Sequence, residues 1–353
     1  MAKELWKGNE AVAEAAIRAG CKYFFGYPIT PQNEIPEYLS RRLPEIGGCF
    51  VQAESEIAAI NMVYGAAGAG SRVMTSSSSP GISLKQEGIT YLAGAELPAV
   101  IVNMMRGGPG LGNISPSQAD YYQATRGGGN GDYRTLVLAP ASIQEAADFT
   151  REAFDIADEY RNPVLILADG MIGQMMEAIE WGEIKKRVLP EKPWATTGTN
   201  GTRKHNIINS LFLNAEDCTA HNKRLAEKLK RIEENEVRFE LIGDEDAEIL
   251  FVAYGTTSRL TRAAMMLLKQ RGVKSALLRP ITLWPYPYKQ LYAAAARQSI
   301  KNVVAVELSM GQMIDDVRIA LNGIKPVSFV GIGGGVIPTP SEIADAAFSA
   351  TGR

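Results

Sequence analysis

Glu56 is the first residue whose type and position could support chemistry. It opens a run of small and apolar residues at 56–70, EIAAINMVYGAAGAG. A helix that is apolar nearly all round is a buried helix, and a carboxyl group in its first turn is stabilised by the helix dipole and opposed by desolvation. We therefore expect a buried carboxyl group that serves a ligand. The alternative is a glutamate that only caps backbone donors, although Glu54 is the more natural capping or solvated residue.

Arg106 is the second candidate, because it ends the apolar segment 99–105 and begins the sequence RGGPGLG. Ligands of open parallel sheets bind beyond the carboxyl ends of the strands. A guanidinium group at such an end, beside flexible glycines, suits a carboxylate ligand held by two hydrogen bonds. The alternative is an ion pair with a core acid such as Asp120.

Two further segments follow expected strands. In YPITP at 27–31, two prolines restrict the backbone around Thr30 and could present its hydroxyl group to a ligand. The same residues also suit a helix start, with Thr30 as the N-cap and Pro31 at the first helical position. The segment SSSSPG at 76–81 could cradle a phosphate through backbone donors, with a serine-rich connector as the alternative.

A scaffold of alternating strands and helices must position these residues. Up to about residue 182, we expect helices at 9–19, 31–43, 55–69, 83–95 and 142–159, and strands at 22–25, 49–52, 72–75, 99–104, 135–138 and 163–168. Such alternation implies a parallel sheet covered by helices on both faces. The glycine-rich segment 107–132 is too long for an idle loop, so we expect it to be functional.

The pattern changes after this first domain. Residues 183–245 form an irregular excursion with a charged helical segment at 216–236, interpreted as a solvated helix or, alternatively, an arm that binds a partner. The alternation resumes from residue 246. We therefore expect a first domain at 1–182, a linking excursion at 183–245 and a smaller α/β domain at 246–353.

Composition excludes several classes of protein. The 353 residues are 46% hydrophobic and 22% charged, as expected for a globular chain with two cores. Three widely spaced cysteines and two histidines exclude a disulfide framework and a cysteine-rich metal motif. The net charge of −2 gives no sign of a nucleic-acid or membrane partner. With no signal peptide and no apolar run of about 20 residues, we expect a cytoplasmic protein.

Several motifs together resemble a known family. The segments YPITP (27–31), ESEIAAINMVYGAAGAG (54–70), TSSSSPG (75–81) and RGGPGLGNISPSQAD (106–120) resemble the alpha subunit of 2-oxoacid:ferredoxin oxidoreductases. Residues 253–287 are similar to the transketolase C-terminal domain. The resemblance implies a thiamine diphosphate enzyme: a doubly wound parallel sheet that binds the pyrimidine half of the cofactor, followed by a transketolase C-terminal-like α/β domain.

The same resemblance assigns roles to the candidate residues. Glu56 would bind N1′ of the aminopyrimidine and shift the ring toward its imino tautomer. Thr30 and Arg106 would hold the carboxylate of the 2-oxoacid. The remaining cofactor contacts would come from the segments that follow strands, namely Tyr27, Pro28, Ile29 and Ser79.

The implied reaction is the coenzyme A-dependent oxidative decarboxylation of a 2-oxoacid to acyl-CoA and CO₂, with electrons passed to ferredoxin. The superfamily's metal–diphosphate motif begins with GDG and ends in two asparagines, whereas this chain has only ADGM at 168–171. The resemblance therefore implies no metal site here. It implies a beta subunit that carries Mg²⁺ and the diphosphate motif, a gamma subunit and an iron–sulfur delta subunit.

One departure from the family pattern bears on the substrate. Relatives of broad or 2-oxoglutarate specificity tend to have a Ser-Thr pair where this chain has Gly110 and Leu111. A less polar site should prefer an aliphatic substrate, and with GGGNGDYR at 127–134 this resembles the branched-chain type, which acts on 3-methyl-2-oxobutanoate.

Three alternatives to the hypothesis of a branched-chain-type oxidoreductase subunit remain. A 2-oxoglutarate-type subunit would share the chemistry. A non-catalytic scaffold or regulator would be expected to lose Glu56, Thr30 or Arg106, and all three are present. A ferredoxin-independent decarboxylase or transketolase-like enzyme would need the diphosphate motif in its own chain or in a partner without clusters.

Overall fold

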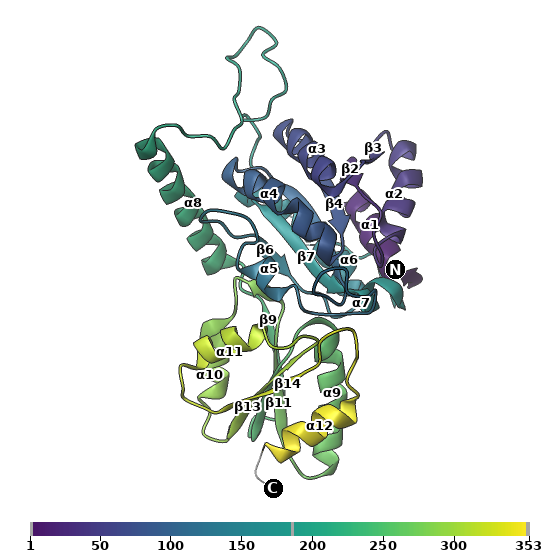
Figure 1. The fold of residues 1–353 in the computed structure, drawn as a ribbon, viewed down its shortest axis with the longest axis vertical. Helices are drawn as coiled ribbons and strands as arrows, with labels where there is room; N and C mark the ends of the chain where they lie inside the picture. The colour runs from purple at the N-terminus through teal and green to yellow at the C-terminus, as the bar shows by residue number, and fades with distance from the viewer. Residues whose placement is uncertain (1–2, 185–186, 351–353) are drawn as a thin grey trace.

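The computed structural model describes residues 3–184 and 187–350, which form two α/β bodies stacked end to end (Figure 1). The first body is built on a seven-stranded sheet. Across the sheet the strands are β12 (Thr282–Trp284), β6 (Leu136–Leu138), β7 (Pro163–Asp169), β5 (Ala99–Met105), β4 (Val73–Ser77), β2 (Tyr23–Gly26) and β3 (Cys49–Gln52). All neighbours pair in parallel except β12 and β6. The predicted α/β class is confirmed.

Helices cover both faces of this sheet, because its buried strands present apolar side chains to either side. One face packs against α3 (Glu56–Gly68) and α4 (Ser79–Gly94). The other face packs against α1 (Gly8–Arg18), α2 (Glu34–Glu45) and α6 (Ile143–Tyr160). Shorter elements complete the body: α5 (Tyr121–Thr125), α7 (Gly170–Gln174), and the antiparallel pair of β1 (Glu4–Lys7) and β8 (Met176–Ile179).

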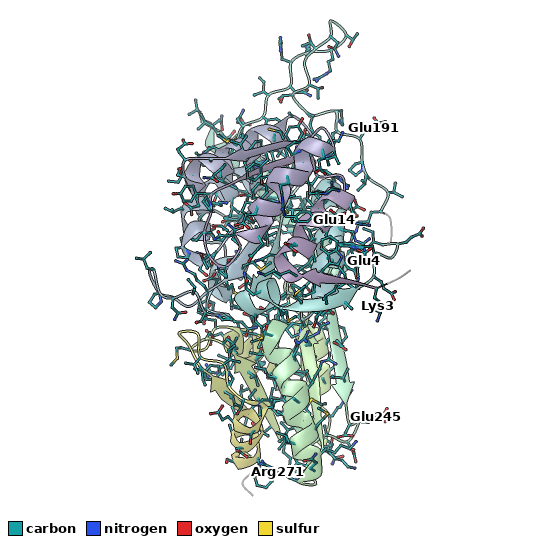
Figure 2. All side chains as sticks on the ribbon, turned by 90° about the vertical axis from the view of Figure 1, so that its right-hand side faces the viewer. Lys3, Glu4, Glu14, Glu191, Glu245 and Arg271 are labelled. Atoms are coloured by element: carbon teal, nitrogen blue, oxygen red, sulfur yellow. The ribbon has the colours of Figure 1, made fainter. Side chains whose placement is uncertain are left out.

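The second body has a five-stranded sheet in which only β9 runs antiparallel to its neighbour. Its order is β14 (Val327–Gly331), β13 (Asn302–Glu307), β10 (Ile249–Val252), β11 (Ser275–Pro280) and β9 (Phe239–Gly243). One face packs against α9 (Gly255–Gln270) and α12 (Pro340–Ser349), the other against α10 (Tyr288–Ala295) and α11 (Met313–Leu321). In the turned view, Arg271 after α9 lies far from the first body and Lys3 lies near the junction (Figure 2).

The interval 183–245 differs from the expectation in two ways. Its charged helix, α8 (Ala215–Asn235), is not solvated all round, because it buries a stripe at positions 221, 225, 228 and 232 against the first body. Two members of that stripe are His221 and Lys228. Because both are polar residues, the sequence does not show that this face of the helix is packed. In addition, β9 lies within the interval and forms an edge of the second sheet by pairing with β11.

Strand β12 joins the two bodies. It comes from the second half of the chain, yet it pairs antiparallel with β6 at the edge of the first sheet. The sheet expected from residues 1–182 is parallel, and a strand from outside that range adds an antiparallel edge to it. Local patterning could not reveal the pairing, because a three-residue strand acquires its partner only when the two bodies dock. No helix within residues 3–184 and 187–350 is long and apolar enough to cross a membrane.

Candidate functional site

The strand order of the first sheet reverses around β2, which has β3 on one side and β4 on the other. Ligands of doubly wound sheets bind outside the carboxyl ends of the strands at such a reversal. The segment 27–31 follows β2, and residue 78 and the N-terminus of α4 follow β4. A hydrogen bond of 2.9 Å from the amide of Ala53 to the carbonyl of Gly26 brings the start of α3 to the same place.

Glu56 is the first residue of α3 and only 7% exposed. Capping is performed by its neighbour Ser55, whose hydroxyl oxygen accepts a 3.1 Å hydrogen bond from the amide of Ala58. The carboxyl group of Glu56 makes no hydrogen bond to another residue in the described part of the chain. The interpretation as a capping glutamate is therefore wrong. The side chain is mostly buried, but its carboxyl oxygens keep some accessible surface, so the group is available to a ligand.

The approach of Glu56 to α4 depends on Gly81. A Cβ atom at this position would lie 2.7 Å from Oε1 of Glu56 and 2.0 Å from Oγ of Ser77. Glycine is thus the residue that leaves room for both side chains. The hydroxyl groups of Ser77 and Ser78 are also buried, and neither has a hydrogen-bond partner among the described residues.

Ser79 has a different role from its two neighbours. Its hydroxyl group donates to Asp120 over 2.6 Å and accepts from the backbone amide of Arg106 over 3.0 Å, while its own amide donates to Asn103 over 3.1 Å. Asp120 also accepts from the Asn103 amide group, and burial raises the pKa of this aspartate. The polar groups of Ser79 therefore hold the segment in place, and the unpartnered hydroxyl groups are those of Ser77 and Ser78.

Arg106 bridges two segments rather than pairing with an acid. Its Nη1 donates to the carbonyl of Thr30 over 3.0 Å and its Nη2 to the carbonyl of Leu111 over 3.1 Å. No carboxylate lies within ion-pair distance of Arg106 in residues 3–184 and 187–350, so the alternative of a pair with Asp120 is wrong. Nε of Arg106 is buried and has no hydrogen-bond partner in the part of the chain that the structure describes, which leaves a charged donor available for an anion.

The turn at 27–31 is not a helix start. Helix α2 begins at Glu34 with Asn33 as its N-cap, so the interpretation of Thr30 as a helix cap is wrong. The reason is tertiary: the carbonyl of Pro31 accepts hydrogen bonds from Asn9 over 2.7 Å and from Gln174 over 2.9 Å, which holds this residue outside the helix. Thr30 itself is exposed.

The structure thus brings most of the predicted residues to one edge of the sheet. Glu56 lies against Gly81, and Arg106 is bonded to Ser79 and to the turn that carries Thr30. Tyr27 and Ile29 are partly exposed in that turn, beside the exposed Pro28. The side chain of Leu111 is 83% exposed, and only its carbonyl group reaches Arg106. The carboxyl group of Glu56 and the unpartnered hydroxyl groups of Ser77 and Ser78 fit the polar edge of an aminopyrimidine ring.

Comparison with known proteins gives the family. Residues 14–239 match the family model described as "Pyruvate flavodoxin/ferredoxin oxidoreductase, thiamine diP-bdg", and residues 247–343 match "Pyruvate:ferredoxin oxidoreductase core domain II". The chain belongs to the 2-oxoacid:ferredoxin oxidoreductase family. The resemblance seen in the sequence is confirmed.

Individual members of the 2-oxoacid:ferredoxin oxidoreductase family are similar over nearly the whole chain. Ketoisovalerate oxidoreductase subunit VorB of Methanothermobacter thermautotrophicus is 52% identical over 95% of this chain and 94% of its own length. 2-Oxoglutarate synthase subunit KorA of the same organism is 38% identical over 96% of each chain.

Solved structures show the same fold. The 2-oxoglutarate:ferredoxin oxidoreductase of Magnetococcus marinus matches with a TM-score of 0.84 and 27% identity, over 98% of this chain but 65% of that chain. A split-gene transketolase shares the fold alone, with 15% identity, a TM-score of 0.61, and coverage of 98% of this chain and 97% of its own.

Sequence reasoning missed two residues of this oxidoreductase chain. Lys85 of α4 is wholly buried, and Gln118 is wholly buried where the two bodies meet. The only signal for Lys85 was a charged residue on a helix expected to pack on a sheet. Within the described ranges, no group of three or more His, Cys, Asp or Glu residues could hold a metal ion.

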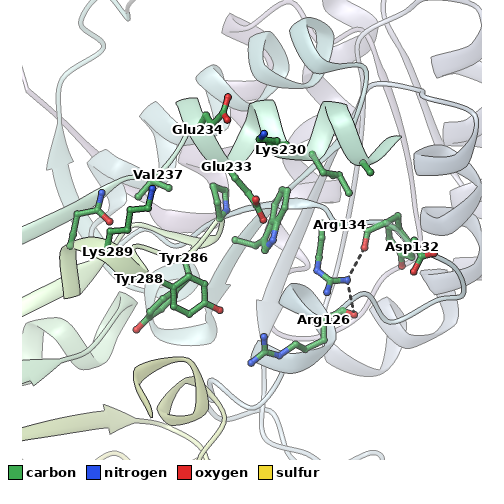
Figure 3. Close-up of a pocket in the computed structure, with 16 residues that line it drawn as sticks. Arg126, Asp132, Arg134, Lys230, Glu233, Glu234, Val237, Tyr286, Tyr288 and Lys289 are labelled. Atoms are coloured by element: carbon green, nitrogen blue, oxygen red, sulfur yellow. Dashed lines mark hydrogen bonds between the residues drawn. The ribbon is translucent and has the colours of Figure 1, made fainter. Parts of the chain in front are cut away.

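The oxidoreductase chain also has a cavity that lies away from this site. A cavity of about 850 Å³ opens between α8 and the second body. Figure 3 shows Lys230 and Glu233 of α8 on one side and Tyr286 and Tyr288 on the other. Its lining includes no residue of the 27–31 turn, α3 or α4, and cationic and acidic side chains both line it, so its charge favours no particular ligand.

Proposed function

We propose that this chain is the alpha subunit of a coenzyme A-dependent 2-oxoacid:ferredoxin oxidoreductase that acts on 3-methyl-2-oxobutanoate. Glu56 binds N1′ of the aminopyrimidine of thiamine diphosphate. The observation that carries this proposal is the position of Glu56 at the reversal of strand order. Its side chain is mostly buried, its carboxyl group has no hydrogen-bond partner among the described residues, and it faces Gly81 of α4, where a Cβ atom would collide with it.

The residues of this chain have separable tasks. Bound thiamine diphosphate supplies the carbanion-stabilising chemistry that lets a 2-oxoacid lose CO₂. Glu56 holds a proton at N1′. Arg106 orients the substrate carboxylate through its free Nε donor, and Thr30 offers a hydroxyl group from the adjacent turn. Tyr27, Pro28 and Ile29 line the cofactor on that side.

The substrate is supported by the relatives and by the loop after Arg106. The ketoisovalerate oxidoreductase subunits are 52% identical to this chain, against 36–39% for the 2-oxoglutarate synthase subunits. Gly110 and Leu111 have no side-chain hydroxyl group with which to bind a second carboxylate at these two positions of the loop.

The proposal requires partner subunits. Asp169 of the ADGM segment is buried and caps α7 through the amides of Met171 and Ile172, and burial raises the pKa of this aspartate. Its carboxylate is therefore committed to the fold rather than to a metal. A beta subunit would supply Mg²⁺ and the diphosphate site, and gamma and iron–sulfur delta subunits would carry electrons to ferredoxin.

The test is to purify the tagged chain with its partners and to measure viologen or ferredoxin reduction in the presence of coenzyme A. We expect 3-methyl-2-oxobutanoate to give the highest kcat/KM in a panel with 2-oxoglutarate and pyruvate, and mass spectrometry to identify the partner subunits. Preference for 2-oxoglutarate would reassign the substrate, and no reduction with any of the three would overturn the proposal.

A further inference from the structure

A buried lysine lies on the face of α4 that packs against α3. Positions 81, 85 and 88 share one face of the helix, because they are separated by four and three residues. Gly81 faces Glu56, and a Cβ atom at Gly88 would lie 2.4 Å from Cγ2 of Ile60. Figure 1 shows α3 and α4 side by side on this face of the sheet. Lys85 thus lies between two close contacts with the first turns of α3.

The ammonium group of Lys85 has no ion-pair partner within residues 3–184 and 187–350. The residue is 0% exposed, and Nζ donates to Oγ1 of Thr75 over 2.6 Å and to the carbonyl of Ser76 over 3.0 Å. Both acceptors are neutral. Burial lowers the pKa of Lys85 to about 7, and the negative charge of Glu56 acts in the opposite direction.

Glu56 is the acid that faces Lys85. Strand β4 brings no titratable side chain, since its sequence is VMTSS. Asp120 and Arg106 lie at the N-terminal end of α4, where both are bonded to Ser79. The charge on Lys85 is therefore balanced by Glu56 across the α3–α4 contact and by no other carboxylate in the described ranges.

We propose that Lys85 is a positioning residue, whose buried ammonium group attracts the carboxyl group of Glu56 across the α3–α4 contact and holds it in place for its hydrogen bond to the aminopyrimidine. The inference rests on the proposed role of Glu56. Opposite charges attract strongly away from bulk water, so the ammonium group favours one position of the facing carboxyl group. In that position the carboxylate can accept a charge-assisted hydrogen bond from a protonated N1′ of the ring, which is stronger than a neutral one.

The lysine is also linked to the substrate side. Ser76, whose carbonyl accepts from Lys85, donates through its hydroxyl group to Gln32, and the amide of Gln32 donates to the carbonyl of Ile29 over 3.1 Å. Lys85 therefore supports the turn that carries Thr30 as well as the position of the Glu56 carboxyl group. Two substitutions separate these effects: Lys85→Gln keeps a hydrogen-bond donor without the charge, and Lys85→Met removes both.

The first experiment measures the effect of Glu56 on the pKa of Lys85 in the chain without cofactor. The full chain is labelled with ¹³Cε-lysine and titrated by NMR, and the Lys85 signal is the one missing from the Lys85→Met variant. We expect it to titrate near neutral pH in the wild type and about one unit lower in Glu56→Gln, because an opposite charge nearby raises the pKa of a lysine. An unchanged midpoint in Glu56→Gln would overturn the inference.

The second experiment measures thiamine diphosphate affinity in the assembled complex by fluorescence titration, with thermal melts to confirm folding. We expect Lys85→Gln and Lys85→Met each to weaken binding by about tenfold, the order of one charge-assisted hydrogen bond. Lys228→Met is the matched control, because Lys228 is also buried but pairs with Glu96, remote from the site. The Lys228→Met variant should bind thiamine diphosphate as tightly as the wild type does.

The outcomes distinguish this inference from the proposed function. Loss of affinity in Glu56→Ala together with wild-type affinity in both Lys85 variants would overturn the role of Lys85 alone. If Lys85→Met weakens thiamine diphosphate binding and Lys85→Gln does not, the hydrogen bonds of Lys85 matter and its charge does not. That result would also overturn the inference. Wild-type affinity in Glu56→Ala would overturn the cofactor role of Glu56 itself.

Discussion

Gln118 and Tyr254 bond each other twice across the boundary between the two bodies. Nε2 of Gln118 donates to the backbone carbonyl of Tyr254 over 2.9 Å, and the Tyr254 hydroxyl group donates to the backbone carbonyl of Gln118 over 3.2 Å. Both residues are wholly buried. Oε1 of Gln118 also accepts from the amide of Leu308 over 3.0 Å. The loop that begins at Arg106 is therefore held by the second body.

Replacing Gln118 with alanine should loosen this junction. The change leaves the amide of Leu308 without its partner and removes one of the donors to the carbonyl of Tyr254, which costs about 1–3 kcal/mol of the free energy of unfolding. Urea denaturation measures the loss. Gln123→Ala is the control, because the amide group of Gln123 bonds only to the hydroxyl group of Ser83 at the surface. Equal stability of the two variants would contradict the structural role of Gln118.

Replacing Glu56 with alanine should abolish turnover of the assembled complex without disturbing assembly. The loss of a group that holds a proton in the reaction lowers kcat by at least about 100-fold. Viologen reduction measures turnover, and size-exclusion chromatography measures assembly. The control is Glu54→Ala, two residues earlier and exposed. Near-normal activity of Glu56→Ala would remove the cofactor assignment.

Replacing Arg106 with alanine should mainly raise KM for the 2-oxoacid. A charge-assisted hydrogen bond to a carboxylate contributes about 1.5–3 kcal/mol, which corresponds to a rise of roughly 10- to 150-fold. KM for coenzyme A should change little. Steady-state kinetics measure both constants, with Arg41→Ala on the exposed face of α2 as the control. An unchanged KM for the 2-oxoacid would show that Arg106 only holds the carbonyls of Thr30 and Leu111.

Replacing Gly81 with alanine should displace the carboxyl group of Glu56. The added Cβ atom would collide with Ser77 and Glu56, so we expect thiamine diphosphate affinity to fall by about tenfold or more and stability to fall by about 1–3 kcal/mol. In the control Gly65→Ala, the Cβ atom meets nothing within 4 Å on α3. That change should stabilise the chain by about 0.5–1 kcal/mol. Equal affinity in both variants would contradict the role of Gly81.

The stability of the chain should depend on pH through Lys85. Burial lowers the pKa of this residue from its ordinary 10.5 to about 7. Between these values the unfolded chain binds a proton that the folded chain does not, so the free energy of unfolding rises with pH across this window. The loss of folding free energy that comes from protonating buried Lys85 is complete below about pH 7. Lys85→Met should therefore raise Tm more at pH 6 than at pH 9, whereas the exposed Lys223→Met should show no such difference. A pH-independent effect of Lys85→Met would contradict this.

Much of the fold follows from local pattern. The expected strand at 49–52 coincides with β3, and the one at 163–168 ends one residue before the end of β7, because turn residues bound these apolar runs. Helix α3 begins one residue after the expected start, since Ser55 caps it. The expectation failed at residue 31, where hydrogen bonds from Asn9 and Gln174 to the Pro31 carbonyl delay the helix. Those partners lie far away in the sequence.

The sequence by itself determined the strand–helix alternation, the family, and the candidates Glu56, Thr30 and Arg106, because periodicity and motifs are local properties. Only the tertiary structure decided which of their groups remain available. Ser79 proved to be bonded to Asp120 while Ser77 and Ser78 were left without partners. The tertiary structure also placed Lys85 on the face of α4 that packs against Glu56, and Gln118 against Tyr254. Burial and hydrogen-bond partnership depend on which surfaces pack together, and that is settled only when helices dock on sheets and one body docks on the other.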